Sequence, residues 1–224
     1  MKKKKKKVRI RFTGILIILL FFYLLFYLVN SFLNIGITNI YIKGNYYLTD
    51  QEIIDMSNIG DYPSTFKNSS KKIEKSIEKN IYIIDVEVKK KNFTKVYIEV
   101  KENRPLYYNS SLEKTILSDK AEVDKIYHVP TLINYIPNTI IDDFNKSMLI
   151  IDIDILERIS EIKYDPNEVD DTRFLLTMTD GNYVYLTLKD NNFEKINSYV
   201  SILKDLGDKK GILNLDYGNH LEDY

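Results

Sequence analysis

The sequence predicts an α+β protein with a single N-terminal transmembrane helix, a small β-α-α-β-β domain and then a mixed antiparallel-sheet β domain with helices. Three observations predict it: an uncharged apolar run at residues 13–33, short segments of alternating apolar and polar residues, and amphipathic helical segments between them. About 190 of the 224 residues follow the apolar run, which is enough for two small domains. We expect a basic tail at residues 1–12, the membrane helix at 13–33, a first domain at 34–104 and a second at 105–224.

The apolar run has the length and composition of a membrane-spanning helix. Its residues would rise about 31 Å as a helix, close to the hydrocarbon thickness of a bilayer. Eight lysines and arginines precede it without an acidic residue, which predicts a cytoplasmic N-terminus. A cleaved signal peptide is the alternative, but it has a shorter apolar region and an A-x-A-type site, which the following NIGITN lacks. We therefore expect an uncleaved single-pass anchor, with the C-terminus outside the cytoplasm.

The rest of the chain is acidic and contains no cysteine. Of 32 basic and 32 acidic side chains, eight basic ones lie in the tail, which leaves 24 against 32. Phosphate contacts need clustered lysine and arginine, so we expect no nucleic-acid partner. Without disulfides, hydrophobic packing must hold the domains together, which favours an envelope protein of a bacterial cell membrane.

The first domain is predicted in the order β-α-α-β-β. A strand at residues 39–43 ends at Gly44, and Thr49 with Glu52 forms a capping box that opens a short helix. A second helix starts at Ser69 or Ser70, and two alternating strands follow. The residues expected on the buried faces are Ile53, Met56, Ile73 and Ile77 of the helices, Tyr82, Ile84, Val86 and Val88 of the second strand, and Val96, Ile98 and Val100 of the third.

The second domain has a weak pattern at its start and a clear one at its end. Short strands are predicted around Leu106 and Thr115, and residues 138–161 are predicted to be mostly helical. Asp180-Gly181 separates two alternating runs, and a hairpin turn with positive φ at both residues is expected there. Further elements are a helix with Phe193, Ile196, Val200 and Leu203 on one stripe that stops at Gly207, and a last strand at 212–217 with Leu213, Leu215 and Tyr217 on one face.

The residues do not form a recognisable catalytic, metal or cofactor site. The absence of cysteine excludes a thiol nucleophile, and the two histidines, His128 and His220, are interpreted as solvated loop residues. The segment 165–171 lacks the spacing of a calcium-binding loop. The acidic pairs Asp142 with Asp143 and Asp152 with Asp154 suggest carboxylate catalysis, a cation site or a solvated helix face, and the last is favoured. We expect a binding protein rather than an enzyme, with no cofactor.

The order of these parts resembles the FtsQ/DivIB family of bacterial cell division proteins over nearly the whole chain. The motifs are IYIKGN at 40–45, T-x-x-E-I at 49–53, VYIEVKENRP at 96–105, L-x-x-x-D-G at 176–181, F-x-K-I at 193–196 and LNLDY at 213–217. The resemblance implies that the first domain is of the POTRA type. It also implies a non-enzymatic divisome scaffold at the division septum, linking FtsL-type and FtsB/DivIC-type bitopic proteins and septal wall synthases.

Two other classes stay open at this point. One is a membrane-anchored envelope enzyme. The other is an extracytoplasmic chaperone or translocation module, since POTRA domains also serve in outer-membrane assembly and two-partner secretion.

The resemblance implies a partner-binding edge at the end of the chain. In the family, a partner adds a strand to the edge formed by the last strand, which would be residues 211–219 here. The expected partner-binding residues are Asn214, Asp216, Tyr217, Gly218 and Asn219. Tyr217 has two open roles, an outward anchor for the partner or a core residue beside Leu213 and Leu215.

Overall fold

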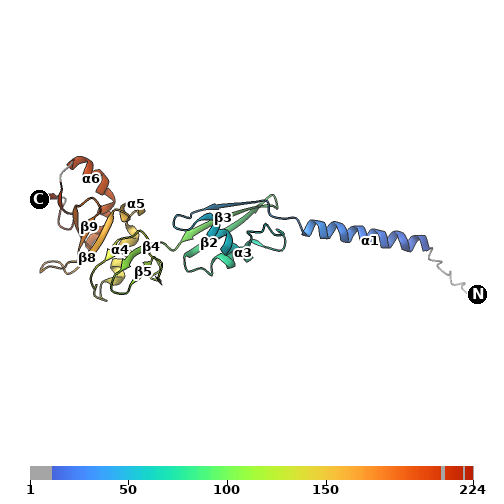
Figure 1. Cartoon of the computed structure of the whole chain (residues 1–224), viewed down its shortest axis with the longest axis horizontal. Helices are drawn as coiled ribbons and strands as arrows, with labels where there is room; N and C mark the ends of the chain where they lie inside the picture. Colours follow the sequence, from blue (N-terminus) through green and yellow to red (C-terminus); the bar gives the residue numbers. More distant parts are fainter. Residues whose placement is uncertain (1–11, 208–209, 219, 224) are drawn as a thin grey trace, which may run out of the picture. The chain divides into compact units, whose positions relative to one another are not determined.

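The computed structural model describes residues 12–207, 210–218 and 220–223, and it has two compact units, Met1–Glu102 and Asn103–Tyr224 (Figure 1). The first unit contains α1 (Phe12–Leu33), β1 (Asn39–Lys43), α2 (Asp50–Ser57), α3 (Ser70–Ile77), β2 (Ile83–Lys91) and β3 (Lys95–Glu102). The second contains β4 (Pro105–Asn109), β5 (Lys114–Leu117), β6 (Glu122–Val123), β7 (Thr131–Leu132), α4 (Ile141–Ile150), α5 (Ile153–Leu156), β8 (Ile159–Tyr164), β9 (Arg173–Met178), β10 (Tyr183–Thr187), the 3₁₀ segment η1 (Lys189–Ser198), α6 (Tyr199–Leu206), β11 (Gly211–Asn214) and β12 (His220–Asp223).

Helix α1 is apolar on every side and none of its residues is buried in the protein. Its 22 residues correspond to about 33 Å of helix, enough to cross a bilayer. By length and composition it is the one membrane-spanning helix among the described residues. The protein is therefore a single-pass membrane protein, as the sequence predicts. The predicted tail at residues 1–12 lies outside the described residues except for its last residue.

The β-α-α-β-β order of the first unit is confirmed. Its sheet has the order β1-β3-β2, with β1 parallel and β2 antiparallel to β3. The capping box at the start of α2 is present in both directions: Glu52 N donates to Thr49 Oγ1, and Thr49 N donates to Glu52 Oε2. Ser69 caps α3. The core of this unit consists of Ile37, Leu48, Ile53, Ile59, Ile73, Ile77, Ile83, Val86, Val88, Val96, Ile98 and Val100.

One face assignment in β2 is wrong. Ile84 is 45% exposed, whereas Ile83 is buried. The pairing register of β2 against β3 shifts between Ile83 and Asp85, which is the signature of a β-bulge. The bulge turns Ile83 inward while Val86 and Val88 keep the predicted orientation.

A glycine and a side-chain carboxylate fix the turn after β1. Gly44 has a φ of +86°, and a Cβ there would lie 2.1 Å from the Val100 carbonyl oxygen, so only glycine fits without displacing the strand. The Glu102 carboxylate accepts hydrogen bonds from the backbone N–H groups of residues 46, 47 and 48. These bonds tie the end of β3 to the segment that opens α2.

The second unit is built on one sheet of nine strands in the order β12-β11-β10-β9-β8-β7-β4-β5-β6. Phe144 of α4 lies at its centre, with ring centroids 4.8 Å from Phe174 and 5.3 Å from Tyr107. The buried Tyr107 hydroxyl donates to Asn145 Oδ1 at 2.9 Å, so the polar end of that ring is satisfied. The predicted strands around Leu106 and Thr115 are confirmed as β4 and β5.

Three predictions in this unit need correction. The helical segment ends earlier than expected, because β8 already begins at Ile159. In the β9–β10 turn only Gly181 has positive φ, and Gly181 N donates to the Met178 carbonyl, so the loop is a three-residue turn with a bulge. The predicted C-terminal helix is divided into the 3₁₀ segment η1, which holds Phe193 and Ile196, and α6, which holds Val200 and Leu203; left-handed Asp190 and Asn191 lie before Phe193.

Candidate partner-binding edge

The prediction that residues 211–219 form the free edge of the sheet is wrong. Strand β11 is parallel to β10 on one side and antiparallel to β12 on the other, so both of its edges are occupied. The chain turns back after β11, and β12 takes the outermost position. Among the described residues no strand pairs with the outer edge of β12, so this short strand is the candidate edge for a partner.

The hydrogen-bond direction along β11 shows which groups of β12 point outward. Gly211 N donates to Asn182 Oδ1 and Leu215 N donates to the Tyr185 carbonyl, so odd-numbered N–H groups of this strand face β10. The even-numbered groups therefore face β12, where residues 212 and 214 lie opposite 222 and 220. It follows that the backbone groups of Leu221 and Asp223 point to the free side of β12.

Asp216 is the best-anchored of the predicted site residues. Its side chain is only 3% exposed, and Arg173 Nε donates to its Oδ2 at 2.8 Å. Arg173 also lies 3.6 Å from an Asp165 oxygen and stacks over the ring of Tyr185 at 3.3 Å. Asp216 Oδ1 in turn accepts from the Tyr217 N–H. This network holds the turn that leads from β11 into β12.

Tyr217 does not pack into the core. Leu213 and Leu215 are buried, but Tyr217 is 57% exposed, because β11 ends at Asn214 and the alternation stops there. Partial burial and the nearby Asp170 carboxylate raise the pKa of the Tyr217 hydroxyl. Of the two roles that the sequence left open, the exposed one agrees with the structure.

The other three predicted partner-binding residues differ in where they lie. Asn214 is buried, and its Nδ2 donates to Glu222 Oε1 at 3.0 Å, which links β11 to β12. Gly218 lies half-buried in the turn beside the ring of His220. Asn219 lies outside the described residues. The structure therefore brings Asn214, Asp216, Tyr217 and Gly218 together at the base of β12, where Asn214 supports the edge from inside the sheet.

A second buried carboxylate stabilises the loop beside this turn. The side chain of Asp170 is fully buried, and its Oδ1 accepts from Thr172 N and Thr172 Oγ1 and pairs with Lys189 Nζ at 3.0 Å. Burial by itself would raise the pKa of this carboxyl, but the hydrogen bonds from Thr187, Thr172 and Lys189 hold it well below its usual range. From the sequence, residues 165–171 are interpreted only as a loop. The one local signal of this turn is the spacing of Asp170 two residues before Thr172.

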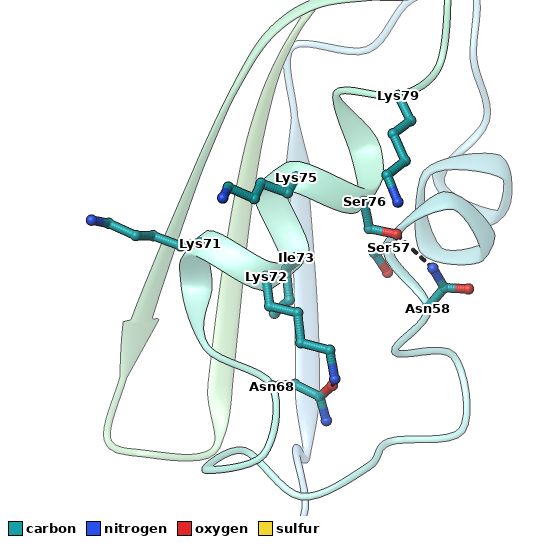
Figure 2. Close-up of a pocket in the computed structure, with 9 residues that line it drawn as sticks. All are labelled: Ser57, Asn58, Asn68, Lys71, Lys72, Ile73, Lys75, Ser76 and Lys79. Atoms are coloured by element: carbon teal, nitrogen blue, oxygen red, sulfur yellow. Dashed lines mark hydrogen bonds between the residues drawn. The ribbon is translucent and has the colours of Figure 1, made fainter.

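A lysine-rich depression lies on the first unit beside α3. Its lining residues are Ser57, Asn58, Asn68, Lys71, Lys72, Ile73, Lys75, Ser76 and Lys79. Figure 2 shows Lys72 extending towards Asn68, and the two are joined by a 2.9 Å hydrogen bond between Nζ and Oδ1. The side chain of Asn58 donates to Ser76 Oγ. The depression is positively charged and suits contact with anions.

The residues that the sequence offers as candidates for catalysis or metal binding, two histidines and two acidic pairs, lie in the described part of the structure. Both histidines are exposed as predicted, but only His128 lies in a loop, because His220 is the first residue of β12. Asp142, Asp143, Asp152 and Asp154 are also exposed, as expected of solvated side chains. The described residues contain no group of three or more His, Cys, Asp or Glu side chains that could hold a metal ion. The arrangement at β12 presents backbone donors and acceptors, so its chemistry is that of strand pairing.

A membrane-spanning helix, a POTRA-type unit and a larger β unit define a class of bitopic envelope proteins. The family model described as "POTRA domain, FtsQ-type" matches residues 36–103. The chain is 27% identical to the cell division protein DivIB of Bacillus subtilis (strain 168) over 233 residues, covering 99% of this chain and 88% of that one. It is 37% identical over 109 residues to DivIB of Clostridium botulinum (strain Hall), covering 47% and 41% of the two chains.

One solved structure is also similar, the major extracytoplasmic domain of the trans isomer of DivIB from Geobacillus stearothermophilus. The likeness covers 47% of this chain and 95% of that one, with 20% identity and a TM-score of 0.38. The chain thus contains an FtsQ-type POTRA domain and is similar to DivIB proteins over nearly its whole length, which supports the FtsQ/DivIB resemblance and a role in bacterial cell division.

Proposed function

We propose that the protein is a non-enzymatic scaffold of the divisome, which pairs through β12 with a strand of an FtsB/DivIC-type bitopic protein. An FtsL-type protein joins the same complex, and the complex links the scaffold to septal wall synthases at the division septum. Residues 1–12 serve as the cytoplasmic tail and 13–33 as the anchor, and residues 34–104 and 105–224 act as two extracytoplasmic domains. Asp216, Tyr217 and Gly218 border the paired strand.

The single observation that supports this proposal is the position of β12 at the end of the sheet. Its outward N–H and C=O groups can form a ladder with an added strand, the mechanism of β-augmentation. The exposed ring of Tyr217 beside this edge adds a large amphipathic contact of the type that is common in binding hot spots.

Asp223→Pro tests the proposal, with Asp223→Ala as its matched control. The proline removes one outward N–H from β12, whereas the alanine removes the same side chain and keeps that donor. Both variants leave the β11–β12 hydrogen bonds intact, so both should melt within a few degrees of the parent. The full-length protein in detergent would be titrated with the extracytoplasmic segment of an FtsB/DivIC-type partner.

We expect Asp223→Pro to weaken this binding about tenfold, equivalent to about 1.4 kcal/mol, while Asp223→Ala binds like the parent. Equal binding by two folded variants would move the interface away from β12.

The proposed orientation has its own test. A reporter that is active only outside the cytoplasm should be active after Tyr224 and inactive before Lys2, because the basic tail favours a cytoplasmic N-terminus. The opposite pattern of activity would refute the extracytoplasmic assignment of both domains.

A further inference from the structure

One end of the POTRA unit is tied closely to the end of the membrane helix. The chain leaves α1 at Leu33, and the Ile35 carbonyl already accepts a hydrogen bond from Thr65 N at 2.9 Å. Ile37 N donates to the Pro63 carbonyl at 3.0 Å, so the segment after the helix pairs with this loop. Two residues span at most about 7 Å, so the loop around Thr65 lies next to the membrane surface.

Three exposed aromatic side chains gather at this end of the unit. Phe66 is 36% exposed, Phe93 66% and Tyr62 50%. Phe32 of the last turn of α1 lies 4.6 Å from Phe66, which lies 6.1 Å from Phe93, measured between ring centroids. Aromatic rings are enriched at the head-group level of membranes. This series of rings therefore continues from the membrane helix onto the surface of the POTRA unit.

Two of these aromatic residues have an unfavourable backbone conformation. Tyr62 has a φ of +50° and Phe93 a φ of +62°, in the left-handed region that bulky residues rarely adopt. Asparagine or glycine would satisfy both turns with less strain. Strain retained at an exposed position points to a function for the side chain rather than for the fold.

Lysines predominate around the rings, and Asp61 beside Tyr62 is an exposed acidic neighbour. Residues 62–73 contain three lysines and residues 88–98 contain four, with no aspartate or glutamate in either segment. Lys67 Nζ donates to Asn34 Oδ1 directly after α1, and Lys71 and Lys72 lie on the first turn of α3 (Figure 2). This basic region contrasts with the excess of acidic residues in the chain beyond the tail. Each lysine close to an anionic lipid surface adds to membrane attraction.

We propose that this end of the POTRA unit is a second membrane-contact site, which docks on the anionic leaflet from which it emerges. Tyr62, Phe66 and Phe93 insert among the head groups, and the surrounding lysines contact lipid phosphates. Docking restricts the tilt of the POTRA unit on its anchor. The proposal concerns the lipid contact and does not depend on strand pairing at β12.

The absence of tryptophan from the sequence allows a direct test with single-tryptophan reporters. Phe93→Trp would be placed in the full-length protein, reconstituted into vesicles with phosphatidylglycerol, with or without bromine atoms on the acyl carbons nearest the head groups. The matched control is Tyr46→Trp, which is 59% exposed and follows the far end of β1. Phe66→Trp is a second reporter with ordinary backbone conformation, should Phe93→Trp not fold.

We expect brominated lipid to lower the emission of the Phe93 and Phe66 reporters about twofold and to leave the Tyr46 reporter unchanged, because interfacial side chains lie about 5–10 Å into the boundary. Combining a reporter with Lys67→Glu and Lys91→Glu should reduce the quenching, whereas Lys43→Glu at the far end of β1 should not. Equal emission with and without bromine in folded reporters would overturn the proposal, as would quenching that does not respond to the two charge reversals.

Discussion

The ion pair between Arg173 and Asp216 gives the sharpest prediction about the second unit. Asp216→Ala removes a carboxylate that is 3% exposed and accepts from Arg173 Nε at 2.8 Å, and it also removes the acceptor for the Tyr217 N–H. Loss of a hydrogen bond to a charged group costs about 1.5–3 kcal/mol, and breaking a buried pair costs about 3–5 kcal/mol. Arg173 keeps its contacts with Asp165 and Tyr185, so we expect about 2–3 kcal/mol.

Calorimetry of the full-length protein in detergent would measure this effect. For a unit of this size a loss of 2–3 kcal/mol corresponds to a decrease of about 10 °C in the melting temperature of the second unit. Asp143→Ala is the matched control, since it breaks an exposed pair with Lys146 and should have little effect. An Asp216→Ala variant that melts at the parent temperature would show that this pair does not hold the β11–β12 turn.

The other predictions concern both units and use the same calorimetric assay. Ile98→Asp places an unpaired carboxylate in a strand position that is 1% exposed, so the transition of the first unit should disappear while the second unit still melts. Gly44→Ala should destabilise the first unit strongly, since its Cβ would lie 2.1 Å from the Val100 carbonyl oxygen; a parent-like melting temperature would contradict that contact. Burial raises the pKa of Tyr107 and Tyr199 above the ordinary value near 10, so the stability they contribute is present below about pH 10 and is lost as the pH rises further. Tyr107→Phe should make the alkaline loss of stability smaller, and an unchanged alkaline profile would exclude this explanation.

The first unit could be predicted well because its signals are local. The capping box of Thr49 and Glu52 and the alternation through Val96, Ile98 and Val100 each lie within a few residues of sequence. The error at Ile84 has a physical reason. Ile83 and Ile84 are equally apolar, so only the pairing of β2 with β3 decides which of them faces the core.

The candidate site was harder to predict because its geometry depends on contacts between distant residues. Strand β12 has the short polar sequence His-Leu-Glu-Asp, which carries no clear alternation, so the sequence predicts β11 as the last strand. Arg173 and Asp216 are 43 residues apart, and no local pattern indicates that they pair. Tyr217 shares a face with Leu213 and Leu215 only if the alternation continues past Asn214, where the chain turns, so the sequence alone leaves both of its roles open.

The most direct test of the scaffold role is the location of the protein in dividing cells. A full-length copy with a fluorescent protein before Met1 would be imaged together with a marker of the septum, in cells whose native copy is depleted. We predict a band at the division site that contracts with the septum and supports division. An even distribution over the membrane while the tagged protein supports normal septation would contradict the account.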